Sequence, residues 1–205
     1  NRLVTHVEEA HERGITVVTL DSALNSEIPV SFVATDNVAA GLEAGTEIDR
    51  IVAPGKSIAI ISHIRGVATA IDRERGVLDA LAHRSPQQLI GPYYSENDLE
   101  LAYQTTVELV SEEPNLGGIV ALNENSTVGA GRALRDLDVY EQIALVGFDN
   151  SKEEIEFLED GVVKALVVQR PFNMGYVGIT TLVEAIRGKH VEQIIHAGAV
   201  LVRKE

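Results

Sequence analysis

The 205-residue sequence contains no cysteine. Without cysteine the chain can form no disulfide, no thiolate nucleophile and no thiolate metal site. It also has no uninterrupted run of about 18 apolar residues, the length that a membrane-spanning helix requires, so none of it is expected to cross a bilayer. A cysteine-free composition suits an exported protein and equally a cytoplasmic one, so it leaves the compartment open.

Positive charge is scarce in this sequence. The 17 lysines and arginines stand against 31 aspartates and glutamates, which gives a formal net charge of −14. An acidic surface repels phosphate backbones, so direct contact with nucleic acid is not expected. Hydrophobic residues make up 45% of the chain, which is enough to build a core and argues against disorder.

Strand-like and helix-like patterns alternate along most of the chain. Runs rich in β-branched residues predict strands at Ile15–Leu20, Ser31–Thr35, Ser57–Ile61, Leu89–Tyr94, Gly118–Leu122, Ile143–Phe148 and Val162–Val168. Apolar residues at helical spacing predict helices at Val38–Val52, Val67–Leu81, Leu99–Val110, Thr127–Leu137, Lys152–Leu158 and Met174–Ile186. This alternation predicts an α/β fold with parallel sheets. Strands that are apolar at consecutive positions indicate burial on both faces.

Polar residues gather where the predicted strands end, and ligands bind at that edge of an open parallel sheet. Their carboxylate, amide and guanidinium groups form planar, paired hydrogen bonds that suit a neutral polyhydroxylated ligand. Taken singly, an Asp or Asn after a strand is more often a helix cap. The candidates are Asp21, Asn37, Arg73, Asn123, Asp149 and Gln169, with Tyr94 as an aromatic partner.

Signals for catalysis are weak. Gly55-Lys56-Ser57 resembles the end of a phosphate-binding loop, but Arg50 stands where the required glycine would be. There is no G-x-S-x-G elbow, and His63 is an isolated histidine after a strand. We therefore expect no enzyme, no catalytic residue, no metal site and no cofactor; an enzyme of doubly wound fold is the least favoured alternative.

Several of these segments occur in the same order in one known family. They are Ile15–Ser22, Ala34–Gly41, Arg73–Gly76, Ala121–Glu124, Leu145–Asp149, Val167–Pro171 and Met174-Gly175. With them the whole chain resembles the type I periplasmic sugar-binding proteins of ABC importers, the ribose-binding-protein-like group. The effector domains of LacI-type repressors share this fold.

The resemblance implies two Rossmann-like lobes that close around one sugar or related polyol. An N-terminal lobe would comprise residues 1–36 and 170–192, and a C-terminal lobe residues 37–169 and 193–205. The polar residues at the strand ends match sugar contacts of the family, and Tyr94 or Tyr93 would supply an aromatic face. Ser22 stands where the family often has arginine, and Arg170 where asparagine is common.

Family members begin with further strand–helix units before the position that matches Asn1. The resemblance therefore implies an N-terminally truncated first lobe, which a missing N-terminal segment or a second chain would complete. The implied function is capture of a sugar for an ABC permease outside the cytoplasm. The effector domain of a cytoplasmic LacI-type repressor and the sensor domain of a receptor stay open as alternatives, which the upstream sequence would distinguish.

Overall fold

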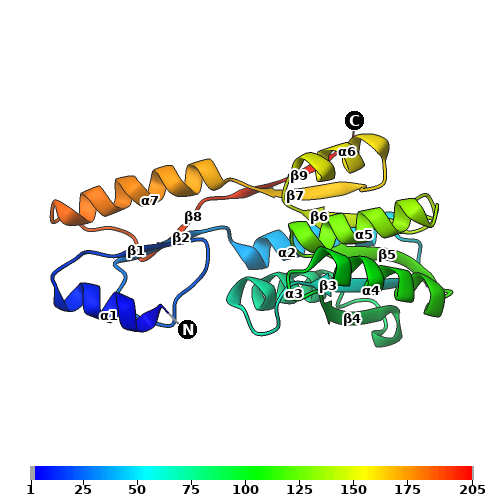
Figure 1. The fold of residues 1–205 in the computed structure, drawn as a ribbon, viewed down its shortest axis with the longest axis horizontal. Coiled ribbons are helices and arrows are strands. Elements are labelled where there is room, and N and C mark those ends of the chain that lie inside the picture. The colour runs from blue at the N-terminus through cyan, green and yellow to red at the C-terminus, as the bar shows by residue number, and fades with distance from the viewer. Residues whose placement is uncertain (1–2, 205) are drawn as a thin grey trace. The chain divides into compact units, whose positions relative to one another are not determined.

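A computed structural model describes residues 3–204, which form two compact units (Figure 1). Unit 1 comprises Asn1–Asp36 and Gln169–Ala199, and unit 2 comprises Asn37–Val168 and Val200–Glu205. Both units contain parallel sheets with helical connections, so the predicted α/β fold is confirmed. None of the helices in the described part is long and apolar enough to cross a membrane.

Unit 2 is built on a six-stranded sheet with the order β4-β3-β5-β6-β7-β9. The pairs from β4 to β7 are all parallel, as the alternating sequence pattern predicts. The strands are β3 (Ser57–Ser62), β4 (Leu89–Tyr94), β5 (Leu116–Ala121), β6 (Ala144–Phe148), β7 (Ala165–Gln169) and β9 (Ala199–Arg203). Every residue of β3, β5 and β6 is buried, which is the consequence of apolar residues at consecutive positions.

The helices of unit 2 connect these strands. They are α2 (Asn37–Ile51), α3 (Ala68–Ala80), α4 (Leu99–Glu112), α5 (Glu124–Asp136) and α6 (Lys152–Asp160), with a short 3-10 turn at Pro86–Gln88. Helices α2 and α3 approach each other closely through Gly41 and Gly76. A Cβ atom at Gly76 would lie 2.1 Å from the Val38 carbonyl oxygen, so only glycine permits this contact. The glycine pair thereby fixes the position of α3 against α2.

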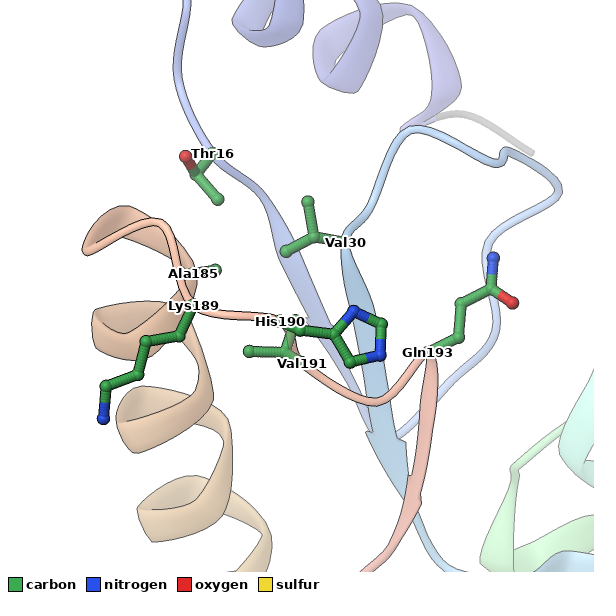
Figure 2. A pocket seen from close by; sticks show the side chains of 7 residues that line it. All are labelled: Thr16, Val30, Ala185, Lys189, His190, Val191 and Gln193. Atoms are coloured by element: carbon green, nitrogen blue, oxygen red, sulfur yellow. The ribbon is translucent and has the colours of Figure 1, made fainter.

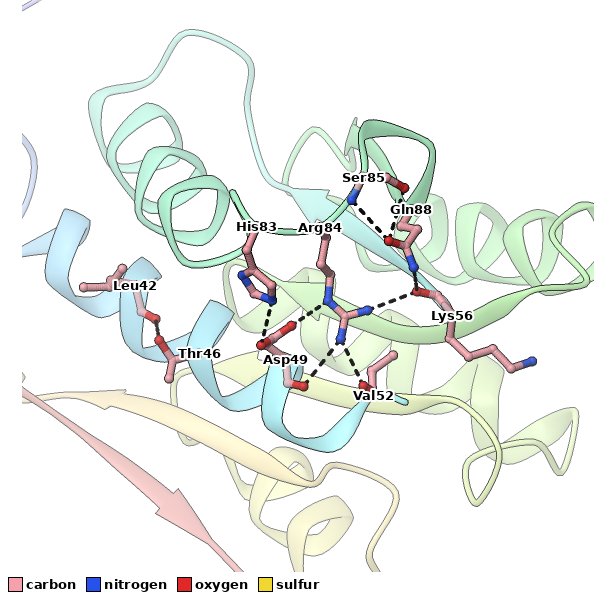
Figure 3. A network of polar contacts seen from close by, with 9 residues as sticks. All are labelled: Leu42, Thr46, Asp49, Val52, Lys56, His83, Arg84, Ser85 and Gln88. Atoms are coloured by element: carbon pink, nitrogen blue, oxygen red, sulfur yellow. Dashed lines mark hydrogen bonds and ion pairs between the residues drawn. The ribbon is translucent and has the colours of Figure 1, made fainter. Parts of the chain in front are cut away.

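Arg84 joins the end of α2 to the loop before β4 (Figure 3). Its guanidinium pairs with Asp49 and donates to the carbonyl oxygens of Val52 (3.0 Å) and Lys56 (3.1 Å). Carbonyl groups at a helix C-terminus have no partner within the helix, and a cation there also offsets the helix dipole. Arg84 therefore stabilises the edge of the sheet where the strands begin.

Unit 1 is much smaller. Its sheet has the order β1-β2-β8, with both pairs parallel, and the strands are β1 (Val18–Leu20), β2 (Ser31–Ala34) and β8 (Ile194–His196). Helix α7 (Pro171–Ile186) packs on β1 and β2, and α1 (Val4–Glu12) lies on the other side of the sheet (Figure 1). The buried core of this unit centres on Val33, Met174 and Ala197. No residue of α1 is buried.

The last boundary between the units differs from the lobe boundary that the resemblance implies. The resemblance places residues 193–205 in the C-terminal lobe, but β8 pairs with β2, and residues 193–199 belong to unit 1. Neither β8 nor β9 was predicted. A three-residue strand with two exposed positions carries too short a pattern to be recognised, and Gly198 interrupts the run that follows it.

Candidate functional site

Arg73 is the centre of a polar cluster in unit 2. It lies in α3 with only 4% of its surface exposed. Its Nε donates to Asn37 Oδ1 (2.8 Å) and its Nη1 to the carbonyl oxygen of Leu122 (2.7 Å). The guanidinium carbon lies 4.5 Å from the ring centroid of Phe148. Arg73 thus connects the start of α2 with the carboxyl ends of β5 and β6, in a fixed orientation.

Asn123 follows β5 and is the N-cap of α5. Its Oδ1 accepts the Ser126 amide hydrogen (3.3 Å), so the helix-capping role that was weighed against a ligand role is real. Its Nδ2 donates to Asn97 Oδ1 (2.8 Å), on the loop between β4 and α4. Asn97 has a positive φ of 60° and also accepts a bond from Asn125 at its carbonyl oxygen. Asn97 is not among the predicted contacts, because its pairing with Asn123 joins two loops that α4 and β5 separate in the sequence.

Asp149 follows β6 in the left-handed region, with φ of 80°. Its Oδ2 accepts the amide hydrogen of Glu124 at the start of α5 (3.2 Å). The carboxylate therefore stands at the N-terminal end of a helix, where backbone amides and the helix dipole favour negative charge. Four of the predicted residues, Asn37, Arg73, Asn123 and Asp149, are thus brought to one edge of the six-stranded sheet.

Tyr94 ends β4 and belongs to a neighbouring cluster. Its hydroxyl donates to Glu74 Oε2 (3.2 Å), and the guanidinium carbon of Arg65 lies 4.2 Å from its ring centroid. Burial, followed by the charge of Glu74, raises the pKa of Tyr94 above its ordinary value. The predicted aromatic face is therefore covered on one side by Arg65.

The other two predicted residues belong to unit 1. Asp21 follows β1 with φ of 69°, and its amide donates to the Val33 carbonyl oxygen (2.9 Å). Gln169 ends β7 and its Oε1 accepts the hydroxyl of Thr35 (2.8 Å), at the end of β2. Each of these residues again lies at the carboxyl end of a parallel strand.

Unit 1 also has an open cavity of about 590 Å³ (Figure 2). Thr16, Val30 and Gln193, which line it, precede β1, β2 and β8, and Lys189 and His190 follow α7. This cavity lies at the edge where the strands begin, whereas the predicted ligand contacts lie where strands end. Among residues 3–204 no group of three His, Cys, Asp or Glu is placed to hold a metal ion.

Parallel sheets with fixed amide, carboxylate and guanidinium groups at their carboxyl ends define a ligand-binding α/β protein. Comparison with known proteins identifies the class more closely. Residues 1–190 match the family described as periplasmic binding protein domain, and the chain belongs to this family. The family consists of binding proteins, which confirms the prediction that the chain is not an enzyme.

Two curated relatives are sugar-binding proteins of Escherichia coli (strain K12). The D-allose-binding periplasmic protein is 28% identical over 191 residues, which cover 89% of this chain and 61% of the relative. The ribose import binding protein is 26% identical over 200 residues, covering 97% of this chain and 67% of the relative. The chain thus spans between three-fifths and two-thirds of the length of these proteins.

A solved structure has the same fold. The ABC transporter solute binding protein from Agrobacterium vitis with bound D-fucose superposes with a TM-score of 0.91 at 34% identity. The match covers 98% of this chain and 71% of that protein. The expected type I periplasmic-binding-protein fold is confirmed by this match.

Proposed function

We propose that this chain is part of a solute-binding protein that captures a sugar or related polyol for an ABC importer. The observation that carries the proposal is the cluster of Arg73, Asn37, Asn123 and Asp149 at one edge of the six-stranded sheet. It is supported by relatives that are named for allose and ribose and by a similar protein with bound D-fucose.

The chemistry of the cluster suits a sugar. A carboxylate accepts hydrogen bonds from two hydroxyls, a guanidinium donates to two oxygens, and an amide does both. Asp149 and Arg73 would therefore bind vicinal hydroxyls from unit 2, with Asn37 and Asn123 beside them. In the same proposal Asp21 and Gln169 contribute from unit 1, and Tyr94 offers its remaining ring face.

Location and partners follow from the same proposal. A solute-binding protein of an importer acts outside the cytoplasm, in the periplasm or as a lipoprotein at the cell surface, and delivers its sugar to an ABC permease. This role is supported by the family, which is described as a periplasmic binding protein domain. It is also supported by the ribose relative, which is named as an import binding protein.

We also propose that unit 1 packs against a further polypeptide segment, from the same protein or from a second chain. Helix α7 carries an exposed apolar stripe at helical spacing: Phe172, Tyr176, Ile179, Val183 and Ile186. Strand β1 lies at the edge of its sheet, and Leu20 on it is exposed. An apolar stripe and an open strand edge are features that proteins normally cover.

Sugar capture is tested by a thermal-shift screen of pentoses, hexoses and polyols, followed by calorimetry on the sugars that raise the unfolding midpoint. A ligand that binds only the folded state must raise its stability. If no sugar shifts the midpoint or gives a heat of binding, sugar capture by this chain is refuted.

Asp149→Asn then tests the site. Asparagine keeps the shape of the side chain and tolerates a positive φ. It removes the negative charge of the carboxylate, which strengthens the hydrogen bonds that Asp149 would accept from sugar hydroxyls. Because a hydrogen bond to a charged group contributes about 1.5–3 kcal/mol, the dissociation constant should rise roughly tenfold to a hundredfold. The matched control is Asp138→Asn, which changes an exposed aspartate with φ of 55° at the far end of α5. Equal affinity in both variants would remove Asp149 from the site.

A further inference from the structure

Glu154 is a fully buried carboxyl group in the first turn of α6, with no exposed surface. Its Oε2 accepts the amide hydrogen of Ser151 (2.7 Å), and the Ser151 hydroxyl accepts the amide hydrogen of Glu154 (3.4 Å). Its Oε1 has no hydrogen-bond partner among the described residues. The side chain thereby fixes the turn Asp149–Ser151 that leads from β6 into the helix.

The surroundings of Glu154 oppose a charge on it. Burial, together with the charges of Asp149 and Glu124, raises its pKa from an ordinary 4.5 to about 8, although the bonds from Ser151 lower it. Two cations face α6 from α5: Arg132 gives both of its bonds of 2.7 Å to Glu153, and the guanidinium carbon of Arg135 lies 4.9 Å from the ring centroid of Phe157. Burial and the neighbouring carboxylates therefore favour the uncharged form of Glu154 at neutral pH.

A buried acid that stays uncharged lowers the stability of the fold at neutral pH, whereas a helix-capping side chain that does not titrate has no such cost. The unfolded chain releases the proton above about pH 4.5, whereas the folded chain retains it up to about pH 8. Stability therefore falls as the pH rises between these two values and is level above them. Glutamine could accept the same bond from Ser151 without this cost. A titratable group kept at such a cost beside a ligand residue indicates a role in function.

We propose that Glu154 is a positioning residue for Asp149: its uncharged carboxyl holds the Asp149 turn in the conformation that binds sugar, and loss of its proton releases that turn. The ligand role of Asp149 rests on the proposed function. When Glu154 gives its proton to solvent, the buried carboxylate is repelled by Asp149 and Glu124. Outward movement of the first turn of α6 relieves this repulsion and carries Ser151 and Asp149 with it.

The turn is tested without any sugar. Asp149 Oδ2 accepts the amide hydrogen of Glu124. The protection of this amide against hydrogen exchange therefore reports the position of Asp149. In the unchanged chain this protection should fall as the pH passes about 8. In Glu154→Gln it should persist, because glutamine carries no proton to lose. The matched control is Glu159→Gln, the same change at an exposed position of α6, which should behave like the unchanged chain. Protection that follows the same pH course in all three chains would overturn the proposal.

Sugar affinity supplies the second readout. At about pH 9 roughly one molecule in eleven would retain the proton, so the apparent dissociation constant should be about tenfold weaker than at pH 6. In Glu154→Gln the dissociation constant should be the same at both pH values, whereas in Glu159→Gln the tenfold difference should remain. A tenfold ratio that survives in Glu154→Gln contradicts the proposal. If the Glu124 amide responds as expected but no sugar binds at either pH, the proposed function fails while the control of Asp149 by Glu154 stands.

Discussion

The two units differ in how much of each sheet is buried. In unit 2 every residue of β3, β5 and β6 is buried, and helices with buried glycines pack against one another. In unit 1 the strands β1 and β8 have no buried residue, and α7 leaves its apolar stripe exposed. Unit 2 therefore has the rigidity that holds Arg73 and Asp149 in place, whereas unit 1 has little core with which to hold Asp21.

Two phenylalanines provide the strongest test of this difference. Phe157 in α6 of unit 2 is fully buried, whereas Phe172 in α7 of unit 1 is 87% exposed. Phe157→Ala should lower the free energy of unfolding by about 3–5 kcal/mol, because it removes buried contacts and leaves a cavity. Phe172→Ala should change it by no more than about 0.5 kcal/mol. Denaturant unfolding measures both, and similar losses in the two variants would show that unit 1 has an equally developed core.

Two helix glycines sharpen the comparison. A Cβ at Gly76 would lie 2.5 Å from the Leu42 nitrogen, whereas one at Gly175 in α7 would meet no atom within 4 Å. Gly76→Ala should therefore cost about 1–3 kcal/mol, because α3 must move away from α2. Gly175→Ala should stabilise the chain by about 0.5–1 kcal/mol, since alanine loses less entropy in a helix. The opposite order of midpoints in thermal unfolding would contradict the close contact of α2 with α3.

Ion pairs give the smallest expected difference in stability contribution between the two units. Glu47 is 2% exposed, and bonds from Arg203 and then Arg50 lower its pKa from an ordinary 4.5 to about 2. Its stabilisation is therefore present above about pH 4.5 and lost as the pH falls towards 2. Glu47→Gln should cost on the order of 1 kcal/mol at pH 7, a small value because both arginines are partly exposed, and clearly less as the pH approaches 2.

The comparator in unit 1 is His196→Gln, which removes an exposed pair with Asp36 at 4.0 Å and should have no measurable effect at pH 7. Urea unfolding of both variants at several pH values measures the two contributions. A loss for Glu47→Gln that is constant from pH 7 to pH 2 would exclude ionisation of Glu47 as its origin.

Much of unit 2 could be predicted from sequence because its strands and helices have strong, long patterns. The expected strand at Leu89–Tyr94 has the observed bounds, and the expected helix at Val38–Val52 differs from α2 by one residue at each end. Helix α5 begins at Glu124, three residues before the expected start at Thr127, because Asn123 caps it and its first turn is polar. A polar first turn carries no apolar period, so the apolar pattern alone places the start of α5 too late.

The candidate site could be predicted only as a set of positions. Strand ends predict which residues share an edge, and the structure brings Asn37, Arg73, Asn123 and Asp149 to one edge. The burial of Arg73 against Phe148 and the covering of Tyr94 by Arg65 depend on contacts between elements distant in sequence. Neither is encoded in a local pattern.

Strand β9 has a consequence for how the protein is made. It adds to the unit 2 sheet beside β7, and Arg203 on it bonds Glu47 of α2 at 2.8 and 2.7 Å. Between β7 and β9 the chain passes through α7 and β8, which belong to unit 1. During synthesis the larger sheet therefore lacks one strand, and Glu47 lacks one arginine, until the inserted part of unit 1 has emerged. Vectorial folding of unit 2 is thus completed only after unit 1 has been translated.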